Sequence, residues 1–207
     1  MKIIDISWPI SPEMTAYKDR SVVDFMPIKV FEMDGARESL LQLGTHSGTH
    51  IDAPSHFCED GETIDRMPLS ALIGPCEVVD ATAVKLVITA ADLRTMNIPM
   101  RSRILFKTSN SQRAATDPFD KNFVYLDASA AQFLVDKKTR AVGIDYLGIE
   151  RNQPAHDTHI LLMNNEVAII EGLRLQHVLP GSYQLSCLPM AIVGLEAAPA
   201  RAVLVKL

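Results

Sequence analysis

Four side chains that can bind metal ions or transfer protons lie close together in the first third of the chain: His46, His50, Asp52 and His56. All four have even-numbered positions, so they point to one face of an extended chain. The even-numbered residues between them, Gly48 and Pro54, place no bulky group on that face. Imidazole and carboxylate groups are suitable ligands for zinc, and also for manganese or iron. The segment therefore predicts a metal site.

A straight strand could not gather these ligands around one ion. At a rise of ~3.3 Å per residue, His46 and His50 would lie about 13 Å apart. A helix is disfavoured by the glycine and β-branched residues of the segment, and Pro54 would end it. The chain can bend at Gly48 and at Ala53-Pro54. We therefore expect a bent strand or loop that folds its polar face around the ion.

Further ligands must come from elsewhere in the chain, and the candidates are His156, His159 and Glu171. Glu171 ends the apolar run 167–170, and a carboxylate at a strand end is well placed to bind a metal. His156 and His159 are three residues apart, so both would face the same side of a helix. The residues alone leave the choice between them open. We interpret His177 as structural and Cys58 as a small buried residue.

Short β-branched segments alternate with helical patterns along the chain, which indicates an α/β domain. Several strands are almost entirely apolar, as expected for strands buried on both faces. The strands before residue 90 have little helix between them, so we expect part of the sheet to be antiparallel. The expected strands are 2–6, 28–31, 39–43, 77–79, 104–107, 123–126, 141–144, 167–170, 183–187 and 202–205. We expect one helix from Thr89, another from Ser129, and a loop over residues 11–24 that could cover a site.

Length and composition narrow the class of protein. The 207 residues fit one domain, 1–207, and the net charge of −5 gives no basic surface for nucleic acid. No apolar run approaches the ~20 residues of a membrane-spanning helix, and the start of the chain turns acidic too soon for a signal peptide. The cysteines, three in number and without C-x-x-C spacing, favour a reducing compartment. We therefore expect a cytoplasmic protein with a small-molecule substrate.

The segment from His46 to Phe57 resembles the central motif of the cyclase family of metal-dependent hydrolases, which includes bacterial kynurenine formamidase and isatin hydrolase. Supporting matches are Asp5-Ile-Ser7 with Ile10, the segment Ile170-Glu-Gly-Leu173, and the tail from Leu188 to Val203. The resemblance spans nearly the whole chain. It implies a compact swivelling β/β/α domain with a mixed sheet, assembled as a homodimer or a larger homo-oligomer.

The resemblance also implies the role of each candidate. His46, His50 and Asp52 would bind metal, and His56 would be the catalytic acid/base. A histidine twelve residues before the strand-end glutamate would complete the site, which selects His159 with Glu171. Relatives hold one or two metal ions; we expect zinc, with manganese as the alternative.

The sequence departs from the kynurenine formamidases in the loop after the first strand. Those enzymes carry an aromatic residue followed by Pro-Gly-Asp, where this chain has Thr15-Ala-Tyr-Lys-Asp-Arg20. Tyr17 would replace the aromatic residue as a substrate contact, but the Pro-Gly is missing. The metal motif therefore transfers to this chain, whereas the formylkynurenine specificity does not.

These parts predict an arylformamidase-like hydrolase that cleaves a small amide, formamide or lactam. A metal-activated water would attack the carbonyl, and His56 would carry the proton. One alternative is a non-haem iron oxygenase that uses His50, Asp52 and a distal histidine. The other is a metal-binding domain without catalysis, although structural zinc sites usually use cysteine.

Overall fold

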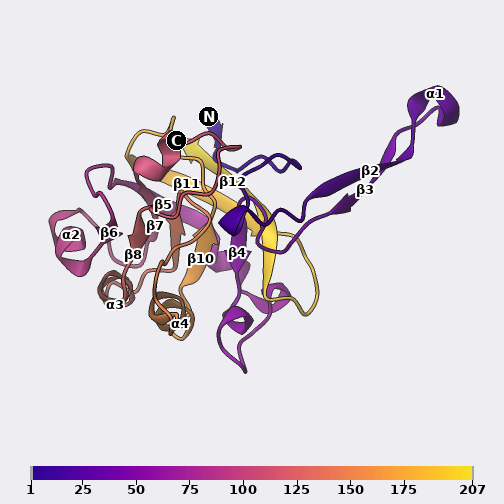
Figure 1. The fold of residues 1–207 in the computed structure, drawn as a ribbon. Helices are drawn as coiled ribbons and strands as arrows, with labels where there is room; N and C mark the ends of the chain where they lie inside the picture. Colours follow the sequence, from indigo (N-terminus) through magenta and orange to yellow (C-terminus); the bar gives the residue numbers. More distant parts are fainter. Residues whose placement is uncertain (1, 207) are drawn as a thin grey trace.

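A computed structural model describes residues 2–206, in which a mixed sheet closes into a seven-stranded barrel (Figure 1). The order around the barrel is β4-β12-β11-β5-β7-β9-β10, and β4 pairs with both β10 and β12 to close it. An eighth strand, β1, adds to the outer edge of β12. The bounds are β1 Lys2–Asp5, β4 His50–Asp52, β5 Ile73–Asp80, β7 Arg103–Lys107, β9 Ala141–Ile144, β10 Ala168–Glu171, β11 Gly181–Pro189 and β12 Ala197–Lys206.

The barrel has a parallel half and an antiparallel half. Strands β5, β7, β9 and β10 run parallel to their neighbours in that series, with the helices in the connections between them. Strands β4, β11 and β12 pair antiparallel, as do β5 with β11 and β1 with β12. The expected α/β class and the expected antiparallel pairing of the early strands are therefore confirmed.

The parallel strands are buried on both faces, which explains their continuous apolar sequences. In β7, Leu105 belongs to the core inside the barrel, whereas Ile104 and Phe106 belong to the outer core under the helices. In β10, Ile170 points inward and Ile169 outward in the same way. Side chains that alternate between two cores fix the register of each strand, because a slip of one residue would exchange the cores.

Three helices cover the outside of the parallel half: α2 (Ala90–Thr95), α3 (Ala128–Asp136) and α4 (Asp157–Met163) (Figure 1). A two-stranded sheet of β6 (Val87–Ile88) and β8 (Tyr125–Leu126) lies beside α2 and α3. Thr89 is the N-cap of α2, as predicted, and the structure adds that it forms a capping box with Asp92. The prediction that Ser129 opens the next helix was wrong by two residues, because Asp127 accepts the Ala130 amide and is the N-cap.

A long hairpin projects away from the barrel (Figure 1). It consists of β2 (Asp24–Lys29) and β3 (Glu38–Gln42), with the single-turn helix α1 (Phe31–Asp34) at its tip. The strand expected at 28–31 therefore starts earlier, and Phe31 belongs to α1. The remaining elements are short 3-10 turns: η1 Tyr17–Asp19, η2 Pro54–His56, η3 Ile64–Arg66, η4 Leu69–Ala71 and η5 Ser109–Gln112. Among the described residues, no helix has the length and apolar character to cross a membrane.

The end of β10 packs against the bend that precedes β4. Gly172 has a φ of +71°, and a Cβ at this position would lie 2.2 Å from the carbonyl oxygen of Gly48. Its amide donates to the carbonyl of Tyr146 over 2.7 Å. Only glycine fits here, because both the backbone conformation and the close approach exclude a side chain.

We expect Gly172→Ala to destabilise the protein by well over 2 kcal/mol, since a left-handed conformation costs roughly 1–2 kcal/mol and the clash with Gly48 adds to it. Gly194→Ala is the matched control: its φ is +80°, but no atom lies within 4 Å of the added methyl group. The measurement is the free energy of unfolding in urea. Equal losses in the two variants would show that the contact with Gly48 contributes nothing.

Candidate active site

The sheet places His50 directly opposite Glu171. The two residues are register partners on the antiparallel strands β4 and β10, so their side chains leave the sheet on the same face. Asp52 follows on that outer face, whereas Ile51 between them fills the inside of the barrel. The strand therefore presents two candidate ligands to the outer face and one apolar side chain to the core.

The imidazole of His50 is held in one orientation. Its Nδ1 lies 2.9 Å from the carbonyl oxygen of Gly48. A carbonyl oxygen can only accept a hydrogen bond, so Nδ1 must carry a proton and donate it. Its Nε2 then faces Glu171 Oε2 at 3.3 Å and Asp52 Oδ1 at 3.5 Å. The ring is 1% exposed. The bend at Gly48, which has a φ of +64°, brings the carbonyl to this position.

Helix α4 brings His159 to the same two carboxylates. Its Nε2 lies 3.5 Å from Asp52 Oδ2 and 3.3 Å from Glu171 Oε1. Each carboxylate therefore offers one oxygen towards His50 and the other towards His159. Separations of this size between donor atoms suit ligands that converge on an ion about 2 Å from each of them.

Some of the buried polar atoms in this group lack a hydrogen bond. Among the described residues, His50 Nε2 and Asp52 Oδ1 have no hydrogen-bond partner, although both atoms are inaccessible to solvent. Buried polar atoms without a partner are costly, so such atoms in a site call for an explanation. A divalent cation would satisfy both of them, and two imidazoles with two carboxylates match the ligands that such cations prefer. The residues present therefore fit a metal ion.

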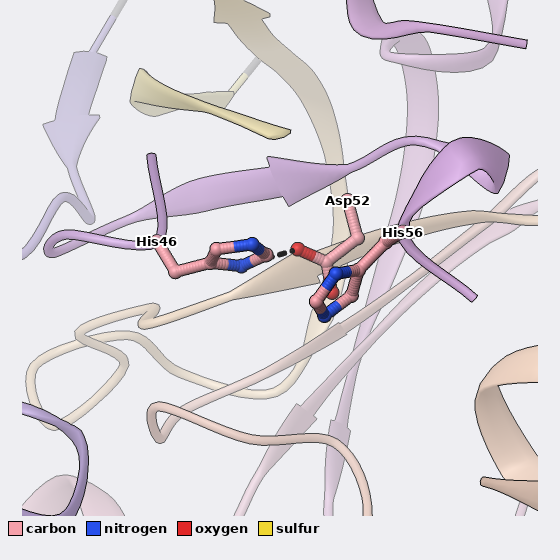
Figure 2. A group of neighbouring side chains, drawn as sticks. All are labelled: His46, Asp52 and His56. Carbon is pink, nitrogen blue, oxygen red and sulfur yellow. Dashed lines mark ion pairs between the residues drawn. The ribbon is translucent and has the colours of Figure 1, made fainter. Parts of the chain in front are cut away.

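His46 and His56 complete the group from the two bends that flank β4. His46 Nδ1 lies 3.1 Å from Asp52 Oδ1, and the His56 ring stands beside the His46 ring with centroids 4.3 Å apart (Figure 2). His56 lies in η2, which begins at Pro54. The bends expected at Gly48 and at Ala53-Pro54 are confirmed, and the chain does fold this polar face around one point.

The histidines and carboxylates of the group shift each other's pKa values towards the charged forms. Burial alone would lower the pKa of His50, but the close contact with Glu171 and the charges of Asp52 and Glu171 raise it to about 9. Burial likewise works against ionised Asp52, yet contacts with His159 and His46 hold its pKa well below the usual range. Burial lowers the pKa of His56, which favours its neutral form. Two anionic carboxylates thus face the imidazoles in a buried place.

A cavity of about 360 Å³ opens over this group. The loop 11–24 contributes Tyr17 and Lys18 to its wall, so the expectation that this loop covers a site is confirmed. Tyr17 is held by an edge contact with Phe119, with ring centroids 5.0 Å apart. The lining residues are Tyr17, Lys18, His46, His50, Asp52, His56, Phe57, Leu147, Gly148, Glu150, His156, His159 and Glu171.

His156 lies at the edge of the cavity, where its ring stacks on Phe57. It contacts Glu150, which sequence reasoning missed because nothing in the pattern of residues 145–153 distinguishes this carboxylate from a surface one. His177 is exposed and lies outside the lining. Cys58 is partly buried, and its thiol contacts Asn164 rather than the cavity.

Comparison with known proteins relates nearly the whole chain to one family. The model of the Cyclase family matches residues 4–151. Cyclase-like protein 3 of Arabidopsis thaliana is 36% identical over 99% of this chain and 80% of its own length. A kynurenine formamidase from Salinibacter ruber is 33% identical over 99% of this chain and 97% of its own length.

Solved structures agree with the fold. A structure described as a potential metal-dependent hydrolase with cyclase activity superposes with a TM-score of 0.88 at 41% identity, covering 98% of this chain and 96% of that one. An isatin hydrolase bound to the product analogue thioisatinate superposes with a TM-score of 0.86, covering 98% of this chain and 91% of that one. Because the sequence identity is 22%, this second match supports the fold alone.

Proposed function

Since the chain belongs to the cyclase family of metal-dependent hydrolases, we propose that it cleaves a small amide, formamide or lactam. It is an amidohydrolase that acts on C–N bonds other than peptide bonds. The observation that carries the proposal is the convergence of His50, His159, Asp52 and Glu171 on one buried point beside His56.

We propose His46, His50, Asp52, His159 and Glu171 as the metal ligands. Asp52 and Glu171 each direct one oxygen towards His50 and the other towards His159, an arrangement that would suit one ion or two. Zinc is our first choice of metal, because imidazole and carboxylate ligands suit it, and manganese is the alternative. His156 is left out of the set: its Nδ1 contacts Glu150, on the far side of His159 from Asp52 and Glu171.

His56 is the proposed acid/base. The bound metal would lower the pKa of water towards ~7 and polarise the scissile carbonyl. His56 stands over Asp52 and His46, at the wall of the cavity, where it can take the proton of the attacking water. The same imidazole then returns the proton to the leaving nitrogen, as general acid/base catalysis requires. Burial favours its neutral form, which is the form that accepts a proton.

The cavity suits a flat, partly apolar substrate. Phe57 and His156 form a stacked pair on one side, with centroids 4.1 Å apart, and Tyr17 borders the mouth. Aromatic walls favour an aromatic group next to the scissile bond. We therefore propose aryl formamides and fused lactams such as isatin as substrates, with Tyr17 as a substrate contact.

We further propose that the protein is a homodimer built on the hairpin arm, residues 24–42. Every residue of β2 and β3 is exposed, including Phe25, Leu40 and Leu41, which are 42–50% exposed. An isolated two-stranded hairpin is at best marginally stable in water, and contiguous exposed apolar surface marks interfaces. A second copy of the chain offers the same arm, and closed two-fold pairing is the commonest arrangement of such copies.

We propose the cytoplasm as the compartment of this protein, where its free thiols would stay reduced.

The first test of function is a substrate screen. Purified protein loaded with zinc or manganese should hydrolyse N-formylkynurenine, a formanilide or isatin, and treatment with a chelator should abolish the activity until metal is restored. Oxygen uptake is measured alongside. Uptake of oxygen by an iron-loaded protein without amide hydrolysis would support the oxygenase alternative, and metal binding without either activity would support a binding module.

Substitutions separate ligands from the proton carrier. His50→Ala, Asp52→Ala, His159→Ala and Glu171→Ala should each weaken metal retention in a graded series of chelator concentrations. His56→Ala should keep its metal and lose about 10²–10⁴-fold in rate, the usual contribution of a positioned acid/base.

His156→Ala is the comparison for His159→Ala, because it removes a nearby imidazole that contacts Glu150 rather than the proposed metal, and it should weaken metal retention far less than His159→Ala does. If His56→Ala loses metal as easily as His50→Ala, His56 is a ligand instead. If His156→Ala loses metal and His159→Ala does not, the distal ligand must be reassigned.

The arm is tested by its effect on molecular mass in solution. Light scattering after gel filtration should give a dimer for the parent protein, and Leu40→Glu should shift it to the monomer. Ser39→Glu is the control, because it adds the same charge to the same exposed strand without removing an apolar group. A monomeric parent at micromolar concentration would overturn the proposal.

A further inference from the structure

A third carboxylate lies behind His159, on the side away from Asp52 and Glu171. Glu150 Oε1 lies 3.1 Å from His159 Nδ1 and 2.6 Å from His156 Nδ1. The other oxygen of Glu150, Oε2, accepts the backbone amide of His159 over 3.2 Å. The Glu150 side chain is only 6% exposed, so this is not a surface ion pair.

The two nitrogens of His159 therefore have different neighbours. Nε2 faces Asp52 and Glu171, whereas the buried Nδ1 lies 3.1 Å from Glu150 Oε1 without forming a well-aligned hydrogen bond to any of the described residues. A neutral imidazole carries its proton on one nitrogen and a lone pair on the other. If Nε2 is to offer the lone pair to a metal, the proton must stay on Nδ1, where a carboxylate can stabilise it.

We infer that Glu150 is a positioning residue that keeps His159 in the tautomer whose Nε2 can bind metal. This inference rests on the proposal that His159 is a ligand. It parallels the arrangement at His50, where the carbonyl of Gly48 holds Nδ1 and leaves Nε2 for the site. Partners of this kind orient metal-binding histidines and make them better ligands.

His156 supports Glu150 from the solvent side. Its Nδ1 contacts the same carboxylate oxygen, and its ring stacks on Phe57 at an interplanar angle of 22°. Phe57 in turn packs against the His159 ring, with centroids 4.8 Å apart. The stacked rings cover Glu150, so its negative charge acts on the histidines with little screening by water.

A purely structural role for Glu150 must be distinguished from positioning. Helix α4 has no side-chain cap at His156, and Glu150 caps it by accepting the amide of His159. Glu150→Gln separates the two roles, because the amide oxygen of glutamine can still accept that backbone amide. The NH₂ group of glutamine would then face Nδ1 and donate to it, which moves the imidazole proton to Nε2.

The experiment compares Glu150→Gln with the parent. Zinc affinity is measured by competition with a chromophoric chelator, and the protonated Nδ1 of His159 is observed by ¹⁵N NMR in the zinc-loaded protein. We expect Glu150→Gln to weaken zinc binding by about 10–100-fold, with little change in melting temperature. While zinc occupies Nε2 the proton stays on Nδ1, so in the zinc-loaded variant we expect the Nδ1–H signal to shift and to exchange faster with water, because its carboxylate partner is gone. Asp157→Asn is the control, since it removes an equal charge from the exposed first turn of α4.

The outcomes separate this inference from the ligand assignment. If His159→Ala binds zinc as tightly as the parent, the ligand assignment fails. If His159→Ala is weakened but Glu150→Gln binds like the parent, only the positioning role is overturned. If Asp157→Asn weakens zinc binding as much as Glu150→Gln does, the effect comes from the net charge alone, and the positioning role of Glu150 is also overturned. Should Glu150→Gln fold poorly, an unprotonated Nδ1 in the zinc-loaded parent would still refute the inference.

Discussion

Strand β4 is paired along both of its edges, and this double pairing fixes the geometry of the candidate site. Three residues, His50 to Asp52, hydrogen-bond to β10 on one side and to β12 on the other, and so close the barrel. The same three residues alternate between the outer face and the core. His50 and Asp52 are therefore fixed in space by the sheet itself, and the site inherits the rigidity of a closed barrel rather than that of a loop.

The clustering of charge over β4 has an energetic consequence. Buried ionic groups cost free energy unless they are paired and hydrogen-bonded, and here the carboxylates of Asp52 and Glu171 share one buried space with two imidazoles, those of His50 and His159. In the absence of metal, the protonated forms of His50 and His159 offset the acids, because the nearby carboxylates raise the pKa of both imidazoles, that of His50 to about 9. Binding of a divalent cation would displace these protons. The site is therefore built for a positive charge, whichever form that charge takes.

Sequence reasoning recovered the parts of the site that are local in the chain. The parity of His46, His50, Asp52 and His56, and the bends at Gly48 and Pro54, follow from the period of an extended strand and from residues that tolerate turns. The apolar sequences of β7 and β10 correctly indicated strands buried on both faces. All of these features depend on neighbours within about ten residues.

The missed features depend on contacts between distant segments. The expectation that His156 and His159 face the same side of a helix was wrong, because His156 is the left-handed residue before α4 and only His159 lies within the helix. The sequence around Glu150 does not distinguish it from a surface acid, whereas in the fold its buried side chain contacts His159 Nδ1. The residues of the arm, 24–29 and 38–42, have the composition of ordinary strands, and no local signal shows that they pair only with each other.

The closure by β4 also sets when the site can exist during synthesis of the protein. One partner of β4, the strand β12, follows it by most of the length of the chain, and His159 and Glu171 also come late. Contacts between such distant segments form slowly, because a long loop must be closed first. A nascent chain that has exposed only His46 to His56 holds these proposed ligands on an open segment without a sheet to fix them. If these residues bind metal as proposed, specific loading must therefore follow closure of the barrel.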